Sequence, residues 1–167
     1  MSLSRRVSRR GLLLSGLGAG TAVGLAACGF TPVYGPGGGG TRLFGKVRPV
    51  DPVDGDGFMF VRRISERLGP DQGAVYALDY RITTATVPQA ITPDQDTTRY
   101  ALNGTVDFSL TEIATGRKIT SGQASSFTSY SASGTVIATT AAERDAHQRL
   151  AVMLADQVIT RLLAAAP

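Results

Sequence analysis

Two stretches in the middle of the chain, residues 76–82 and 100–108, alternate between apolar and polar side chains. A period of two places one kind of side chain on each face of a strand. Both stretches are therefore predicted to be half-buried antiparallel strands. The apolar faces consist of Tyr76, Leu78, Tyr80 and Ile82 in the first stretch, and of Tyr100, Leu102, Val106 and Phe108 in the second.

A third strand is predicted at residues 118–130, which are rich in serine and threonine and only weakly patterned. Its main apolar anchors are Ile119, Phe127 and Tyr130. The preceding residues 114–116 read Ala-Thr-Gly and supply a turn whose glycine accepts a positive φ. The second and third strands are therefore expected to form a hairpin.

A shorter strand is predicted ahead of these three, at residues 42–50, which alternate weakly and end in Arg48-Pro49. Because proline cannot donate a ladder hydrogen bond, this strand should lie near an edge of the sheet. Residues 51–57 then form a turn-rich link.

A first helix is predicted after this link, because apolar residues recur at spacings of three and four. Asp56 is the expected N-cap, and Gly69-Pro70 is the expected stop. Glu66 lies where it can pair with either of two arginines on the polar side. The apolar side holds Phe58, Val61, Ile64 and Leu68, and the polar side holds Arg62, Arg63 and Glu66.

A long C-terminal helix is predicted to begin at a capping box, Thr140-Ala141-Ala142-Glu143. Its apolar stripe is Leu150, Leu154, Val158 and Leu162, extended by Val152, Ile159 and Leu163, with Arg149, Asp156 and Thr160 opposite. The order is thus strand, helix, three strands, long helix. Two helices on one face of a four-stranded antiparallel or mixed sheet would bury every stripe, so the predicted fold class is α+β.

The first 27 residues have the layout of a secretory signal, with a basic head before an uncharged run at residues 11–24. This run is ~14 residues long, short of the ~20 that cross a bilayer. A transmembrane anchor ending in a buried cysteine is the alternative. Ser8-Arg9-Arg10-Gly11 also resembles a twin-arginine signal, so the pattern fits either export route.

The signal ends in Leu25-Ala26-Ala27-Cys28, which resembles the lipobox of bacterial lipoproteins. This resemblance implies that a diacylglycerol is joined to the Cys28 thiol and that residues 1–27 are removed. Cys28 is the only cysteine in the 167 residues, so it cannot form an intramolecular disulfide. Residues 28–41, with their Pro-Gly-Gly-Gly-Gly run, are predicted to be a flexible tether. Residues 42–167 are then one domain.

Net charge gives no sign of a nucleic-acid partner once the signal is removed. The whole chain carries +4, from 17 basic and 13 acidic residues. Four of the basic residues precede Cys28 and no acidic residue does, so the mature chain holds 13 of each. A neutral domain lacks the electrostatic attraction that nucleic acids require.

The sequence shows no catalytic constellation, so neither an enzyme nor a cofactor is expected. The only histidine, His147, is in line with the apolar stripe of the long helix, which favours a partly buried position at the edge of the core. Asp51, Asp54 and Asp56 lack the distant glutamate of a calcium loop and are interpreted as a solvated turn, so no metal is expected.

The start of the mature chain, residues 28–35 (Cys-Gly-Phe-Thr-Pro-Val-Tyr-Gly), resembles lipopolysaccharide-assembly lipoproteins of the LptE family. The resemblance implies two helices on a four-stranded sheet and a lipid anchor on the periplasmic side of the outer membrane. It also implies a partner, the β-barrel LptD, which the lipoprotein plugs and helps to assemble while the pair moves lipopolysaccharide to the outer leaflet.

Three cations are candidates for contacts with lipopolysaccharide, whose phosphates and carboxylates suit arginine and lysine. Arg81 lies on the polar face of a predicted strand, and Arg117 and Lys118 lie at the predicted hairpin tip. Ordinary solvated charges are the alternative for all three. For the whole protein, the alternatives are a tethered periplasmic binding module of another outer-membrane transport system, and a lipoprotein enzyme.

Overall fold

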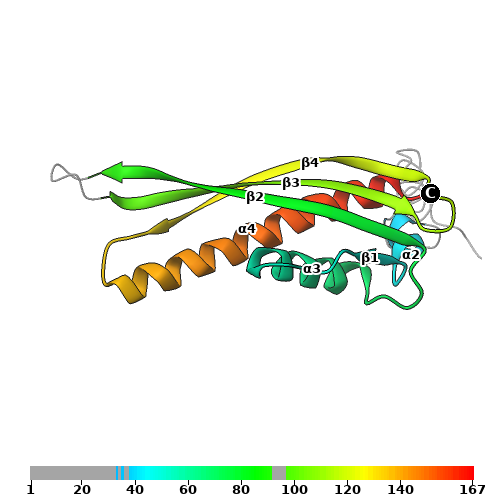
Figure 1. Ribbon diagram of the computed structural model, residues 1–167, viewed down its shortest axis with the longest axis horizontal. Helices are drawn as coiled ribbons and strands as arrows, with labels where there is room; N and C mark the ends of the chain where they lie inside the picture. The colour runs from blue at the N-terminus through cyan, green and yellow to red at the C-terminus, as the bar shows by residue number, and fades with distance from the viewer. Residues whose placement is uncertain (1–32, 34, 36–37, 92–96) are drawn as a thin grey trace, which may run out of the picture. The chain divides into compact units, whose positions relative to one another are not determined.

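The computed structural model describes residues 33, 35, 38–91 and 97–167, so Cys28 and the predicted signal lie outside the described residues. The unit from Val33 onward contains a four-stranded sheet with helices on one face (Figure 1). Its elements are α2 (Gly39–Leu43), β1 (Val47–Pro49), α3 (Gly55–Leu68), β2 (Tyr76–Ile91), β3 (Thr97–Glu112), β4 (Lys118–Ser131) and α4 (Val136–Ala165).

The sheet is mixed, as predicted, with the order β1-β2-β3-β4. The short β1 runs parallel to the start of β2, whereas β2, β3 and β4 are antiparallel to their neighbours over most of their length. The predicted hairpin joins β3 to β4, and Gly116 in its turn has a φ of 70°. The strands extend beyond the alternating stretches. Ser- and Thr-rich segments, which do not alternate clearly between apolar and polar residues, continue the same backbone pairing.

The core lies between the sheet and the two longer helices. The predicted stripe of α4 is confirmed, since Leu150, Leu154, Val158 and Leu162 are all buried. Close approach of α4 to β3 depends on Gly104, where a Cβ atom would lie 2.8 Å from Leu150 Cδ2. Glycine in a strand interior often marks such a contact.

The apolar face of α3 is rotated from the predicted one. Ile64 and Leu68 are buried as expected, but Phe58 is 60% exposed and Phe60 takes its place in the core. At 3.6 residues per turn, Phe58 lies about 120° around the helix from Ile64, whereas Phe60 lies about 40° away. Phe60 packs on Tyr80 with a ring-centroid distance of 4.7 Å.

Both predicted N-caps were wrong. Helix α3 is capped by Asp54, whose side chain accepts a hydrogen bond of 2.7 Å from the Gly57 amide. Helix α4 begins earlier than predicted and is capped by Thr135, so the motif at Thr140 lies inside the helix. The stop at Gly69 is confirmed as the C-cap of α3.

Two further expectations about the strands and the tether also need correction. On β4, Phe127 was expected to be an apolar anchor, but it is 72% exposed. The small Ala124 is buried in its place, and Tyr130 is buried as expected. Gly39 and Gly40 belong to α2 and are buried, although the tether was predicted to include them. A Cβ atom on Gly39 would collide with the Leu163 carbonyl of α4, so this glycine allows a close helix contact.

Candidate functional site

The outer face of the sheet, opposite the helices, is the candidate site because polar side chains cover it. Ladder pairs place Asp79 beside Ser109, and Arg81 beside Asp107. On the other side of β3, Asp107 pairs with Gln123 of β4. These rows consist of the polar residues of the alternation, so the same pattern that buries one face makes the other a hydrogen-bonding surface.

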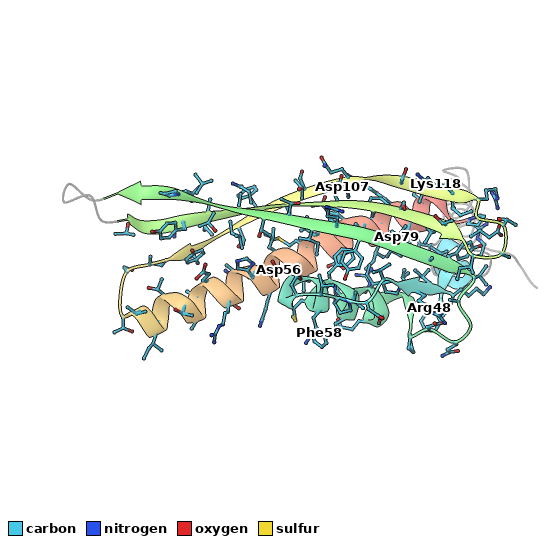
Figure 2. The ribbon with its side chains drawn as sticks, viewed as in Figure 1. Arg48, Asp56, Phe58, Asp79, Asp107 and Lys118 are labelled. Carbon is cyan, nitrogen blue, oxygen red and sulfur yellow. The ribbon has the colours of Figure 1, made fainter. Side chains whose placement is uncertain are left out.

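A shallow depression of about 720 Å³ lies on this face, formed by β2, β3 and β4. Figure 2 shows Asp79, Asp107 and Lys118, which come from these three neighbouring strands. The lining consists of Asp79, Tyr80, Arg81, Asp107, Phe108, Ser109, Lys118, Ser121, Gly122 and Gln123.

Two of the three predicted cations meet in the depression. Arg81 and Lys118, from β2 and β4, both line it, although 36 positions in the sequence separate them. Arg117 does not line it and instead forms an ion pair of 3.4 Å with Glu112. Sequence analysis therefore found two of its charged residues.

Sequence analysis missed the two carboxylates in the depression, Asp79 and Asp107. Gln123 Nε2 donates a hydrogen bond of 2.8 Å to Asp107 Oδ1. Two cations and two anions leave the depression without net charge. The alternation that placed Arg81 on the polar face placed both aspartates there too, so the signal was present in the sequence.

The turn beside the depression is ordered by a small polar network. Thr115 Oγ1 donates a hydrogen bond to the Glu112 carboxylate, and Arg117 lies next to it. These contacts, the threonine first, lower the pKa of Glu112 below its ordinary value. Arg117 thus forms a local ion pair, so it is a weaker candidate for contact with a ligand.

On the helix side, His147 of α4 faces Asp56 of α3, with Nδ1 2.8 Å from Asp56 Oδ2. Both side chains are partly buried, as predicted for the histidine. The two residues lie beside a cavity of about 370 Å³ between the two helices, which Phe58 and Met59 also line. Within the described part of the chain, no group of three or more His, Cys, Asp or Glu side chains could hold a metal ion.

The fold and this surface define the class: a two-layer α+β domain with helices on one side and a polar sheet face on the other. The chain matches the model of the LptE family, "Lipopolysaccharide-assembly", over residues 44–162, and it belongs to that family. Its members are non-enzymatic assembly lipoproteins, which agrees with the expectation that the chain is not an enzyme. No curated protein matches the chain.

Solved structures share the fold. A Caulobacter crescentus CB15 protein described as a lipoprotein has a TM-score of 0.63 at 20% identity, over 75% of this chain and 93% of its own. Rare lipoprotein B from Shewanella oneidensis has a TM-score of 0.56 at 13% identity, over 71% and 92%. Lipoprotein B from Nitrosomonas europaea has 0.55 at 13%, over 72% and 83%.

None of the helices in the described ranges has the length and apolar character needed to cross a membrane.

Proposed function

We propose that this chain is an outer-membrane lipoprotein that plugs the LptD β-barrel, helps it to assemble and takes part in inserting lipopolysaccharide into the outer leaflet. The observation that carries the proposal is the polar outer face of the sheet, within a chain of the LptE family. A barrel lumen is polar, and a plug inside it needs hydrogen-bonding side chains rather than reactive ones.

Anchoring on the periplasmic side of the membrane is assigned to Cys28 in this proposal. Each buried methylene of an acyl chain contributes ~0.8 kcal/mol, so two or more chains hold a protein stably at a membrane. We expect Cys28→Ala to give an uncleaved or soluble form that takes up no radiolabelled palmitate. Palmitate in the Cys28→Ala protein would remove this residue from the anchor.

The plug itself is tested by purifying the chain from outer membranes. A large β-barrel, identified as LptD, should co-purify, and depletion of the chain should lower lipopolysaccharide at the cell surface. If the chain leaves the membrane with no barrel, the plug is refuted. That result would favour the tethered periplasmic binding module, for which the 370 Å³ cavity beside Phe58 and Met59 offers an apolar ligand site.

Lipopolysaccharide contact is assigned to Arg81 and Lys118, which line one depression, more than to Arg117. We expect the double substitution Arg81→Gln and Lys118→Gln to weaken lipopolysaccharide binding by the purified protein. Arg117→Gln is the matched control, because it removes a cation that pairs with Glu112 outside the depression. Equal loss in both variants, or none in either, would contradict this assignment.

A further inference from the structure

The two edges of the sheet differ in how their backbone groups are covered. On the β4 edge, α4 side chains hydrogen-bond backbone carbonyls of the strand. Arg149 Nη2 donates to the Ser129 carbonyl at 3.3 Å, and Gln157 Nε2 donates to the Ser125 carbonyl at 3.0 Å. Arg161 also donates to the carbonyl of Gln123. A strand edge occupied in this way is a poor template for another strand.

The described residues provide no such cover for the β2 edge beyond its first residues. Strand β1 pairs only with Tyr76–Leu78 of β2. The pairing on this side of β2 ends with a hydrogen bond of 3.0 Å from the Val50 amide to the Leu78 carbonyl. From Asp79 onward, the only strand paired with β2 among the described residues is β3. Figure 1 shows β2 continuing far past the end of β1.

Backbone groups on this side of β2 alternate along the strand. Leu78 faces β1, so the amide and carbonyl groups of every second residue after it point to the same side. Four residues in this register follow before Pro88, which has no amide hydrogen to donate. They span about 20 Å at ~3.4 Å per residue, the length of a typical strand. The four residues are Tyr80, Ile82, Thr84 and Thr86.

A pocket of about 260 Å³ lies beside this edge, where the chain turns away after β1. Val50, Val53 and Ile82 give it apolar walls, and its charged lining consists of two carboxylates, Asp51 and Asp54, against one cation, Arg81, which leaves a net negative charge. The pKa of Tyr80 in the same pocket is raised, by burial first and then by these two negative charges. The pocket therefore suits the aliphatic stem and the charge of a lysine or arginine.

We propose that the β2 edge from Tyr80 to Thr86 binds an extended segment of a partner protein by strand addition, with one basic side chain in the pocket beside Asp51 and Asp54. Main-chain hydrogen bonds supply affinity in this mode of recognition, and side-chain pockets supply specificity. The proposal does not depend on a barrel partner.

A second copy of this chain fits the edge less well. Two-fold symmetric copies pair the same edge with itself. Such a pair of antiparallel strands keeps each outer face on the same side of the joint sheet. The β2 segment of a second copy has one basic residue, Arg81, and that side chain already lines the pocket and the outer depression of its own copy. A separate polypeptide with its own basic residue meets the requirement.

The test uses the full chain in detergent and two short end-blocked peptides of alternating valine and threonine, one with a central lysine and one with a central glutamate. Amide hydrogen exchange should slow at Ile82, Thr84 and Thr86 when the lysine peptide is added. Amides of β4 should not change. The glutamate peptide should bind about tenfold more weakly, because it places like charge beside the two aspartates.

Two variants separate the backbone from the charge. Thr84→Pro removes one edge amide at a position where an edge strand tolerates proline, and it should weaken lysine-peptide binding about tenfold. Asp51→Asn leaves the backbone intact and should reduce the preference for lysine over glutamate. It also keeps the test decisive if Thr84→Pro fails to fold.

Three results would overturn the proposal: no slowing at the β2 edge with the lysine peptide, equal slowing on β4, or equal binding of both peptides by the unmodified chain. Sedimentation of the unmodified chain and of Thr84→Pro can give a fourth result that overturns it. A dimer that dissociates in Thr84→Pro would show that a second copy occupies the edge. Loss of barrel co-purification in outer membranes would bear on the plug alone.

Discussion

The guanidinium group of Arg63 on α3 donates two parallel hydrogen bonds to the carboxylate of Asp156 on α4. Nε lies 2.9 Å from Oδ1, and Nη2 lies 3.0 Å from Oδ2. Hydrogen bonding to Asp156 raises the pKa of Arg63 further above its ordinary value. Arg67 also contacts Asp156, at 3.3 Å, so one carboxylate of the long helix holds two arginines of the shorter one.

Removing the charge of Asp156 should loosen the pairing of the two helices. We expect Asp156→Asn to lower the free energy of unfolding by about 1 kcal/mol, because a bidentate charged pair becomes a weaker neutral contact. Urea denaturation followed by circular dichroism measures this. The control is Arg62→Gln, which breaks an exposed pair with Glu66 and should change stability by less than about 0.5 kcal/mol. Equal effects would show that the α3–α4 pair has no special weight.

A methyl group at Gly104 should destabilise the fold. Its Cβ atom would lie 2.8 Å from Leu150 Cδ2, so Gly104→Ala should cost about 1–3 kcal/mol through overpacking. Gly122→Ala is the matched control on the neighbouring strand, where the nearest atom, of Phe108, lies at an ordinary 3.5 Å. Thermal unfolding of the two proteins measures the difference, and the same melting temperature in both would contradict the close approach of α4.

Gly39 offers a test of the boundary between tether and domain. Because a Cβ atom there would collide with the Leu163 carbonyl, Gly39→Ala should detach α2 from the end of α4. Amide exchange should become faster in Arg42 and Phe44, whose amides donate to the Gly38 and Gly40 carbonyls, and stability should fall by about 1–2 kcal/mol. Gly55→Ala has no atom within 4 Å of the new Cβ and should leave both unchanged. Unaltered exchange in Gly39→Ala would restore the flexible tether up to Thr41.

The cover on the β4 edge should prevent self-association. Replacing Gln157 and Arg161 together with alanine frees the carbonyls of Ser125 and Gln123. Uncovered edges pair with other chains, so the double variant should form concentration-dependent oligomers in size-exclusion chromatography. Arg144→Ala removes an exposed cation of the same helix without touching β4 and should stay at the size of the unmodified chain. A monomeric double variant would mean that the strand's own Ser- and Thr-rich sequence suffices.

Local patterns in the sequence determined the type of most elements. The alternation from Tyr76 to Ile82 predicted a strand with one buried face, and the stripe from Leu150 to Leu162 predicted the buried side of α4. Gly116 marked the hairpin turn. These signals survive because period and turn chemistry depend on the backbone geometry of a few neighbouring residues. They also predicted the α+β class, since few arrangements bury all the stripes at once.

The tertiary structure decided which side chains are buried and which meet, because both depend on the element that packs against them. Phe58 and Phe60 are equally apolar, and the side of α3 that faces the sheet is the one that holds Phe60 and Ile64, where Phe60 packs on Tyr80 of β2. Ala124 rather than Phe127 anchors β4, because the register pairs Ala124 with the buried Val106 and places Phe127 on the other face, beside the exposed Asn103. The sheet brought Arg81 and Lys118 into one depression and left Arg117 with Glu112. The long helix covered one strand edge and left the other open, which no local pattern records, because burial is a property of pairs of elements that are distant in the sequence.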